Sequence, residues 1–171
     1  MKHMSQIIFV LFCVLYLSVV VSAQDAPEVG MKAPEIGISD WIKGETDLKG
    51  KTIFLEFFES WCGNARAQVP KVNKLYEKFG SDDFVFLYLS AQNKDWLEGY
   101  LAKYEVKNPV ARDKTNKIFE AFGITGVPTV FLIDKEGKIA WKGHPMGLKD
   151  EHFEEYFKTG KFPQVSLNGP M

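Results

Sequence analysis

Two long apolar runs with almost no polar alternation lie in the middle of the chain. They occupy residues 51–58 and 84–89, and both are rich in aromatic and β-branched side chains. A strand that is buried on both faces shows this continuous pattern, whereas a half-exposed strand alternates polar and apolar residues. The runs therefore predict two fully buried strands.

A helical pattern of apolar residues follows the second run. Over residues 93–104 the apolar side chains recur on one side of a helix, and they are Trp96, Leu97, Tyr100, Leu101 and Tyr104. Further helices are expected over residues 62–79, 115–122 and 149–158. Helices therefore alternate with strands along the chain.

The remaining strands complete the predicted sheet. Residues 129–134 and 138–142 are joined by Lys-Glu-Gly at 135–137, which is a hairpin signal. A short strand is expected at 109–111, and a loose strand or hairpin at 34–48. This order predicts an α/β fold with a mixed central sheet flanked by helices.

Composition and charge narrow the possible partners. A chain of 171 residues has room for one domain with a sizeable core, and 46% hydrophobic and 25% charged residues are ordinary for a globular protein. The net charge of -1 gives no electrostatic reason to expect nucleic acid or an anionic membrane surface as a partner.

The sequence gives no indication of a cofactor or a metal ion. It contains no Gly-rich phosphate loop, and His144 and His152 have no ligand spacing to each other or to Cys62. We interpret both histidines as surface residues, and no cofactor or metal is expected.

The N-terminus resembles a secretory signal peptide. Lys2 and His3 precede an apolar run over residues 7–21, and Val-Ser-Ala at 21–23 supplies small residues where a signal peptidase cuts. An uncleaved membrane anchor is the alternative, although the run is shorter than the about 20 residues that a spanning helix needs. We expect residues 1–23 to be removed and the mature protein to be extracytoplasmic, either periplasmic or secreted.

Cleavage would leave one cysteine. Cys13 lies within the leader, so the mature chain keeps Cys62 alone. A protein with one thiol cannot form an internal disulfide, and an accessible thiol in an oxidising compartment is open to reaction. Cys62 is therefore the centre of any thiol chemistry.

The mature chain divides into three parts. Residues 24–33 are expected to be a linker, because Pro27 and Gly30 interrupt regular structure. Residues 34–160 are expected to form the folded domain, and residues 161–171 an irregular C-terminal tail.

Cys62 lies between a predicted strand and a predicted helix. Residues 57–66 read FFESWCGNAR, so the cysteine falls at the first turn of the helix that follows the strand. Unpaired N–H groups and the helix dipole favour a negative charge there, and a thiolate is the nucleophile in disulfide exchange. The alternative is that Cys62 is a small buried apolar residue, as many free cysteines are.

Two separated motifs resemble the TlpA/ResA-type branch of the thioredoxin superfamily. The first is residues 48–63, which end in Trp-Cys-Gly, and the second is residues 122–139, which contain Gly-Val-Pro-Thr. The resemblance extends from about residue 34 to residue 158. It implies a thioredoxin-like fold and thiol-disulfide oxidoreductase activity.

The resemblance also implies roles for residues around the cysteine. Trp61 would line the approach to the sulfur, although simple packing is the alternative for this side chain. Gly63 and Asn64 would let a partner backbone come near. Val127 and Pro128 match the cis-proline that faces the active cysteine in this family and leaves a backbone edge for an extended partner.

The motif departs from the family at its fourth position. Ala65 stands where the second cysteine of Cys-x-x-Cys would be, so a mixed disulfide on Cys62 would have to wait for an external thiol. Glu56 matches the family's buried acid, which relays protons mainly to that second cysteine. The alternative for Glu56 is a strand-edge carboxylate that reaches solvent, and Glu59 is interpreted as a solvated residue at the rim.

Two functions from different classes follow. The first is an exported oxidoreductase that acts through Cys62 on protein or small-molecule disulfides of the cell envelope, with cytochrome c maturation as the type of work that the resemblance implies. The second is a catalytically inactive domain that binds polypeptides through the groove at Pro128. A monothiol glutaredoxin-like role resembles the chain only at the single cysteine, and export argues against it.

Overall fold

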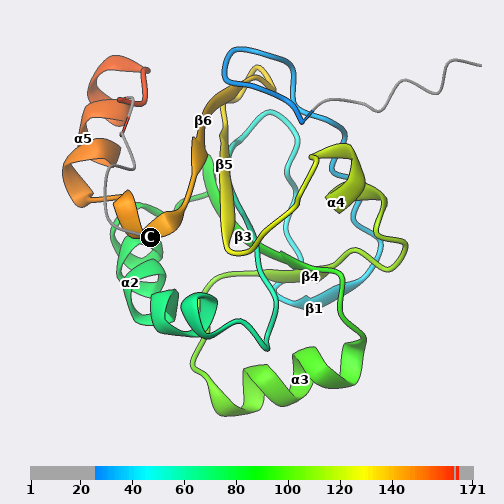
Figure 1. The fold of residues 1–171 in the computed structure, drawn as a ribbon. Coiled ribbons are helices and arrows are strands. Elements are labelled where there is room, and N and C mark those ends of the chain that lie inside the picture. Colours follow the sequence, from blue (N-terminus) through cyan, green and yellow to red (C-terminus); the bar gives the residue numbers. More distant parts are fainter. Residues whose placement is uncertain (1–25, 164, 166–171) are drawn as a thin grey trace, which may run out of the picture.

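The strands of the computed structural model form one mixed sheet (Figure 1). The structure describes residues 26–163 and residue 165. Within them the strands are β1 (Trp41–Lys43), β2 (Thr52–Phe57), β3 (Phe84–Ser90), β4 (Val110–Arg112), β5 (Thr129–Ile133) and β6 (Ile139–Gly143). Their order in the sheet is β1-β4-β3-β2-β5-β6. The predicted α/β fold with a mixed sheet is confirmed.

The two continuous apolar runs form the centre of the sheet. β2 and β3 pair in parallel from Thr52 opposite Phe84 to Phe57 opposite Leu89, and every residue of both strands is buried. β5 pairs antiparallel with the other side of β2. Because helices cover both faces, neither strand needs the polar alternation of an exposed one.

The helices are α2 (Gly63–Phe79), α3 (Lys94–Lys103), α4 (Lys117–Ala121) and α5 (Asp150–Thr159), with a short 3-10 helix, η1 (Pro145–Gly147). Apolar residues of α2, α3 and α5 pack on one face of the sheet. Residues of α4 and of the N-terminal segment before β2 pack on the other face. The alternation of side chains along β2 divides its residues between these two layers.

Some predicted elements are shorter than expected. Of residues 34–48, only Trp41–Lys43 is a strand, and it pairs antiparallel with β4. The helix expected over 115–122 is limited to Lys117–Ala121. Asn116, which precedes it, has a left-handed backbone conformation with φ of 62°, and this ends the regular helix on its N-terminal side.

The segment expected to be a linker is attached to the sheet. The Gly30 N–H donates to the Ile139 carbonyl at 2.8 Å, and the Ile139 N–H donates to the Met31 carbonyl at 2.9 Å. Lys32 forms an isolated antiparallel bridge with Lys138. The predicted leader lies outside the described residues. Among the residues that are described, no helix has both the length and the apolar character needed to cross a membrane.

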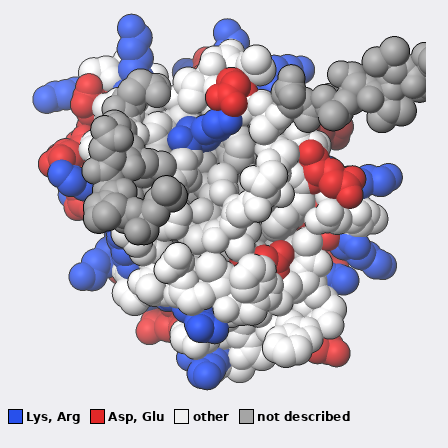
Figure 2. Space-filling model, in the orientation of Figure 1, with Lys and Arg blue, Asp and Glu red and all other residues white. Residues whose placement is uncertain are grey.

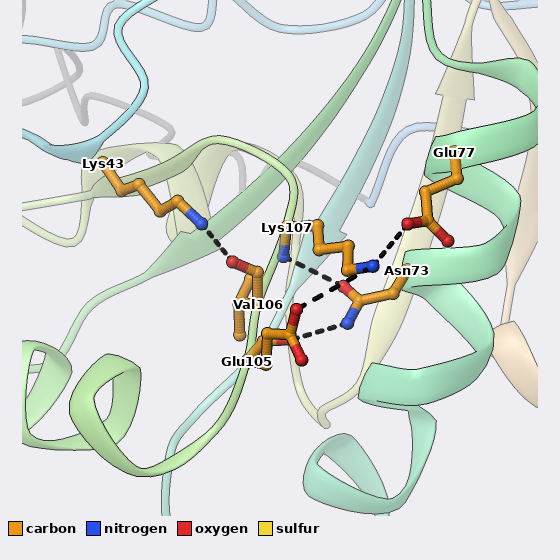
Figure 3. A network of polar contacts seen from close by, with 6 residues as sticks. All are labelled: Lys43, Asn73, Glu77, Glu105, Val106 and Lys107. Atoms are coloured by element: carbon orange, nitrogen blue, oxygen red, sulfur yellow. Dashed lines mark hydrogen bonds and ion pairs between the residues drawn. The ribbon is translucent and has the colours of Figure 1, made fainter.

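A polar network connects α2 to the chain that leaves α3 (Figure 3). Asn73 of α2 is buried, and its side chain donates to the Glu105 carbonyl at 2.5 Å and accepts from the Lys107 N–H at 3.0 Å. The Lys107 ammonium also pairs with Glu77 of α2, and Lys43 of β1 donates to the Val106 carbonyl. These contacts fix the spacing between α2 and the end of α3.

Candidate functional site

Cys62 is placed at the N-terminus of α2 by the loop that follows β2. It is the N-cap residue, its N–H donates to the Glu59 carbonyl at 3.0 Å, and its carbonyl accepts from the Arg66 N–H at 3.1 Å. The first turn of α2 carries no acidic residue. The thiol therefore lies beside N–H groups that have no partner within the helix, and no acidic residue of that turn opposes a negative charge.

The thiol meets a segment that is far away in the sequence. Cys62 Sγ lies 3.4 Å from the Val127 carbonyl oxygen, to which it donates a hydrogen bond. The Val127–Pro128 peptide bond is cis, as the resemblance implied, and Pro128 is buried while Val127 is half-buried. The structure thus brings together the two motifs that were separated along the chain.

Cys62 lies near the surface, but little of it is exposed to solvent. Cys62 is 9% exposed, whereas Trp61 beside it is 65% exposed. Gly63 and Asn64 are also exposed. A Trp side chain that is mostly in solvent is not held there by packing in the core, so the packing alternative for Trp61 does not describe its position.

Ala65 faces the interior of the protein. It is 2% exposed and belongs to the apolar cluster that also contains Cys62 and Val69. A methyl group there can neither exchange protons nor attack a disulfide, so in this chain Cys62 has no neighbouring thiol on its helix.

Glu56 is fully buried in β2, and neither carboxylate oxygen has a hydrogen-bond partner. It shares a face of the strand with Phe54 and Phe58, which both pack in the cluster that contains Cys62 and Ala65. Burial raises the pKa of Glu56 from its ordinary value of 4.5 to about 8. The carboxyl is therefore mostly protonated at neutral pH, and the alternative of a carboxylate that reaches solvent is wrong.

The interpretation of Glu59 as a solvated rim residue is wrong. Glu59 is 8% exposed, and its carboxylate accepts hydrogen bonds from the Ser90 hydroxyl at 3.0 Å and the Ala91 N–H at 3.2 Å. Burial raises the pKa of Glu59, and these two hydrogen bonds oppose the shift. Because β2 and β3 are parallel, their C-terminal ends lie side by side, and Glu59, three residues before Cys62, connects them through these hydrogen bonds.

A groove of about 410 Å³ opens beside the first turn of α2. Its lining residues come from the loop before α2, from α2 and from the region of α3, and they are Ser60, Arg66, Asp95, Trp96, Gly99, Tyr100, Lys103 and Tyr104. The helical pattern placed Trp96 on the same side as Leu97 and Tyr100. Trp96 is instead 64% exposed, while Leu97 and Tyr100 are buried. The sequence pattern did not indicate the groove.

One face of the molecule carries few charges near its middle. Figure 2 shows charged side chains mainly around the edge of the molecule, with a broad uncharged area in the middle of the face that Figure 1 presents. β5 and the chain that leads into it lie on this face. Such a surface suits contact with a polypeptide better than contact with a highly charged polymer.

Each of the two histidines accepts a hydrogen bond from a nearby backbone N–H. His144 Nδ1 accepts from the Met146 N–H at 3.1 Å, and His152 Nδ1 accepts from the Lys149 N–H at 3.1 Å. Among the described residues, no three His, Cys, Asp or Glu side chains gather in a way that could hold a metal ion.

Comparison with known proteins gives consistent matches. The model of the Redoxin family matches residues 28–156. The thiol-disulfide oxidoreductase ResA of Bacillus cereus is 34% identical over 142 residues, which cover 80% of this chain and 81% of that protein. ResA of Bacillus subtilis is 28% identical over 141 residues, which cover 78% of each chain.

Solved structures agree with these matches. A thiol:disulfide interchange protein of the thioredoxin family from Chlorobium tepidum is 25% identical, with a TM-score of 0.57 over 69% of this chain and 88% of that one. The thioredoxin domain of a thiol-disulfide oxidoreductase from Bacteroides vulgatus is 23% identical, with a TM-score of 0.63 over 82% of this chain and all of that one. The second likeness shows the thioredoxin-like fold.

Proposed function

Because the chain belongs to the redoxin family, we propose that it is a thiol-disulfide oxidoreductase that acts through a single nucleophilic cysteine, Cys62. Its substrates are protein or small-molecule disulfides. The observation that carries this proposal is the position of Cys62, at the N-cap of α2 with Sγ 3.4 Å from the Val127 carbonyl and beside the exposed Trp61. The names of the ResA relatives support the same class of reaction.

The reaction has two exchange steps. The Cys62 thiolate attacks one sulfur of a substrate disulfide, forms a mixed disulfide and releases the other sulfur as a thiolate, which takes a proton from solvent. Ala65 cannot continue the reaction. An external thiol, as its thiolate, therefore attacks the substrate sulfur of the mixed disulfide, forms a new disulfide with it and releases the Cys62 thiolate.

The residues around Cys62 would hold the substrate. The backbone at Val127 and Pro128 would pair with an extended partner segment, and Gly63 and Asn64 offer little side-chain bulk against its approach. Trp61 would cover one side of the bound segment. Glu56 lies beneath the site as a buried acid that can hold or release a proton.

The proposal extends to the location of the protein. With the leader removed, it would act in an extracytoplasmic space, on thiols and disulfides of the cell envelope. Maintenance of cysteines there, including those of cytochrome c maturation, is the kind of work that the resemblance suggests. The proposed function involves neither nucleic acid nor a cofactor, and it involves no membrane once the leader has been removed.

A second candidate function is supported by the low exposure of the thiol. Cys62 is 9% exposed and lies against the Val127 carbonyl, so a polypeptide could bind along the backbone at Val127 and Pro128 without any exchange reaction. In that case the domain would be a catalytically inactive binding module.

Intact-mass analysis after incubation with a disulfide-containing peptide separates the two functions. We expect an adduct whose mass equals the protein plus one half of the peptide disulfide, and we expect its loss in Cys62→Ser. Cys13→Ser is the matched control in the full chain, and it should keep the adduct. If the wild-type protein binds the peptide without forming the adduct, the binding module is the correct function.

A further inference from the structure

The groove between α2 and α3 contains two positive charges that have no acidic partner. Arg66 and Lys103 both line the groove, and both are exposed. In the part of the chain that the structure describes, neither side chain forms an ion pair. Asp95 is the acidic residue of the lining, so positive charge is in excess. A concave surface with free cations attracts an anionic ligand, and a guanidinium group matches a carboxylate.

The Arg66 side chain lies next to residues on both sides of Cys62 in the sequence. Its Nη1 donates to the Ser60 carbonyl at 3.4 Å, and its Nη2 lies 3.7 Å from the position that a Cβ atom would take on Gly63. The guanidinium makes no other hydrogen bond within the described residues, so most of its five N–H donors are free for a ligand. A ligand bound to Arg66 would therefore lie beside Cys62.

Gly99 leaves space in the groove. It lies inside α3, where glycine is less favourable than alanine. Its φ is not in the left-handed region, and a Cβ atom there would meet no heavy atom within 4 Å. Neither the backbone nor the packing of the fold requires a glycine at this position. Because Gly99 lines the groove, the space that its missing side chain leaves is available to a ligand.

The size of the groove and its aromatic lining suit a small molecule. Its volume of about 410 Å³ falls within the range of about 300–1,000 Å³ that small-molecule sites occupy. Trp96 offers apolar surface, since it is 64% exposed, and the Lys103 ammonium lies 5.6 Å from the centre of the Tyr104 ring. Val127 and Pro128, where a polypeptide substrate is proposed to pair, do not line this groove. The groove is therefore a second site beside the cysteine.

We propose that this groove binds the external thiol that releases Cys62 from its mixed disulfide, and that this thiol is a small molecule with one or more carboxylates. The inference rests on the proposed function, in which Ala65 cannot supply the second thiol. Arg66 and Lys103 hold the carboxylates, and the rest of the molecule packs on Trp96. Binding raises the local concentration of the thiol next to the disulfide that it attacks.

The bound thiol reacts as a thiolate after it has lost its proton to solvent. It attacks the substrate sulfur of the mixed disulfide, and a new disulfide forms between the small molecule and the substrate. The bond between the substrate sulfur and Cys62 breaks, and its electron pair leaves with Cys62 as a thiolate. The step is an exchange, so it needs no further oxidant or reductant.

Release of a peptide from Cys62 tests this site. In full-length Cys13→Ser protein, an uncharged cysteine peptide is coupled chemically to Cys62, and its release is followed as the concentration of added thiol increases. The probes are mercaptosuccinate, which has two carboxylates, and its neutral diamide. Each rate is divided by the rate of the same thiol with a small model disulfide, which corrects for thiol reactivity.

We expect the rate with mercaptosuccinate to saturate and the rate with the diamide to rise linearly. At low concentration the corrected rate should favour mercaptosuccinate by about fivefold, the upper range for an ion pair at a surface. Arg66→Gln should remove most of this preference, and Lys103→Gln should reduce it. Gly99→Leu changes no charge but fills the groove, so it should abolish saturation. Lys74→Gln is the matched control, because it removes an exposed cation of α2 outside the groove and should keep the preference.

Circular dichroism checks that each variant is folded. Equal corrected rates for the two thiols, a linear dependence on mercaptosuccinate, or equal loss of the preference in Lys74→Gln would each overturn the inference. If Arg66→Gln instead slows only the formation of an adduct with an acidic peptide disulfide, the groove serves the protein substrate and the inference is wrong. Because the mixed disulfide is prepared chemically, these outcomes are separate from the question of whether Cys62 attacks substrate disulfides.

Discussion

At the scale of single residues, the environment of Glu56 has the largest consequences. A carboxyl in the middle of a fully buried strand has no water to stabilise its charge, so its protonated form is favoured. Such an arrangement weakens the fold whenever the carboxyl ionises. A residue that costs stability is easier to understand as part of a functional site than as part of the packing.

We predict that stability falls as pH rises from about 4.5 to about 8 because of Glu56. Over this range the folded protein holds a proton on Glu56 that the unfolded chain has lost, so folding becomes less favourable with increasing pH. The raised pKa corresponds to a loss of about 5 kcal/mol at most. Urea denaturation at several pH values measures it.

Glu56→Gln should remove this part of the pH dependence, because glutamine does not titrate. The control is Glu155→Gln, which changes an exposed residue of α5 and should leave the pH dependence of stability as in the wild type. If the free energy of unfolding changes between pH 5 and pH 8 by the same amount in the wild type and in Glu56→Gln, the Glu56 carboxyl is not held protonated in the folded protein.

Ala65→Cys should restore multiple-turnover disulfide reduction. The substitution places a second thiol one helical turn after Cys62, on the same buried side of α2, so it can displace the reduced substrate. Insulin precipitation measures the turnover. In the restored enzyme Glu56 could exchange a proton with the new thiol at position 65. Glu56→Gln should therefore slow the turnover of this enzyme by about 10²–10⁴-fold.

Ala67→Cys is the control for this experiment. Residue 67 is exposed on the same helix, so a thiol there cannot reach the interior beneath Cys62 and should not restore turnover. Persistent inactivity of Ala65→Cys, or a disulfide that forms once and does not cycle, would favour the binding function over a lost second cysteine.

At the scale of elements, the sequence predicted the strands, helices and turns that depend on local residue patterns. The unbroken apolar runs became the two central strands, and Lys-Glu-Gly at 135–137 is the turn between β5 and β6. The helices were placed to within a few residues, apart from the short α4. These features follow from residue spacing and turn chemistry, both of which are visible in a single chain.

The failures involve partners that are distant in the sequence. Glu59 could not be recognised as buried, because Ser90 and Ala91 meet it only after β2 and β3 have paired. The strand at 41–43 is defined by its pairing with β4 rather than by its own pattern. For Cys62 and Val127, the family resemblance supplied a contact that no spacing rule could predict.

At the scale of the whole molecule, we predict that the exported chain begins at Gln24. The short apolar run at 7–21 and the small residues at 21–23 are the basis. Intact mass of the protein recovered from the extracytoplasmic fraction measures it. As a control, Leu11→Asp places a charge in the apolar run and should prevent export. A chain that still starts at Met1 and stays with the membrane would contradict the prediction.

The segment before β1 also affects how much backbone is free at one edge of the sheet. At one edge, Gly30 and Met31 occupy the hydrogen-bonding groups of Ile139, at the start of β6. At the other edge, β1 is only three residues long. Unpaired strand edges are where copies of a protein join into aggregates, and short or covered edges prevent this. The β1 edge and the start of β6 therefore offer little free backbone on which another copy could build.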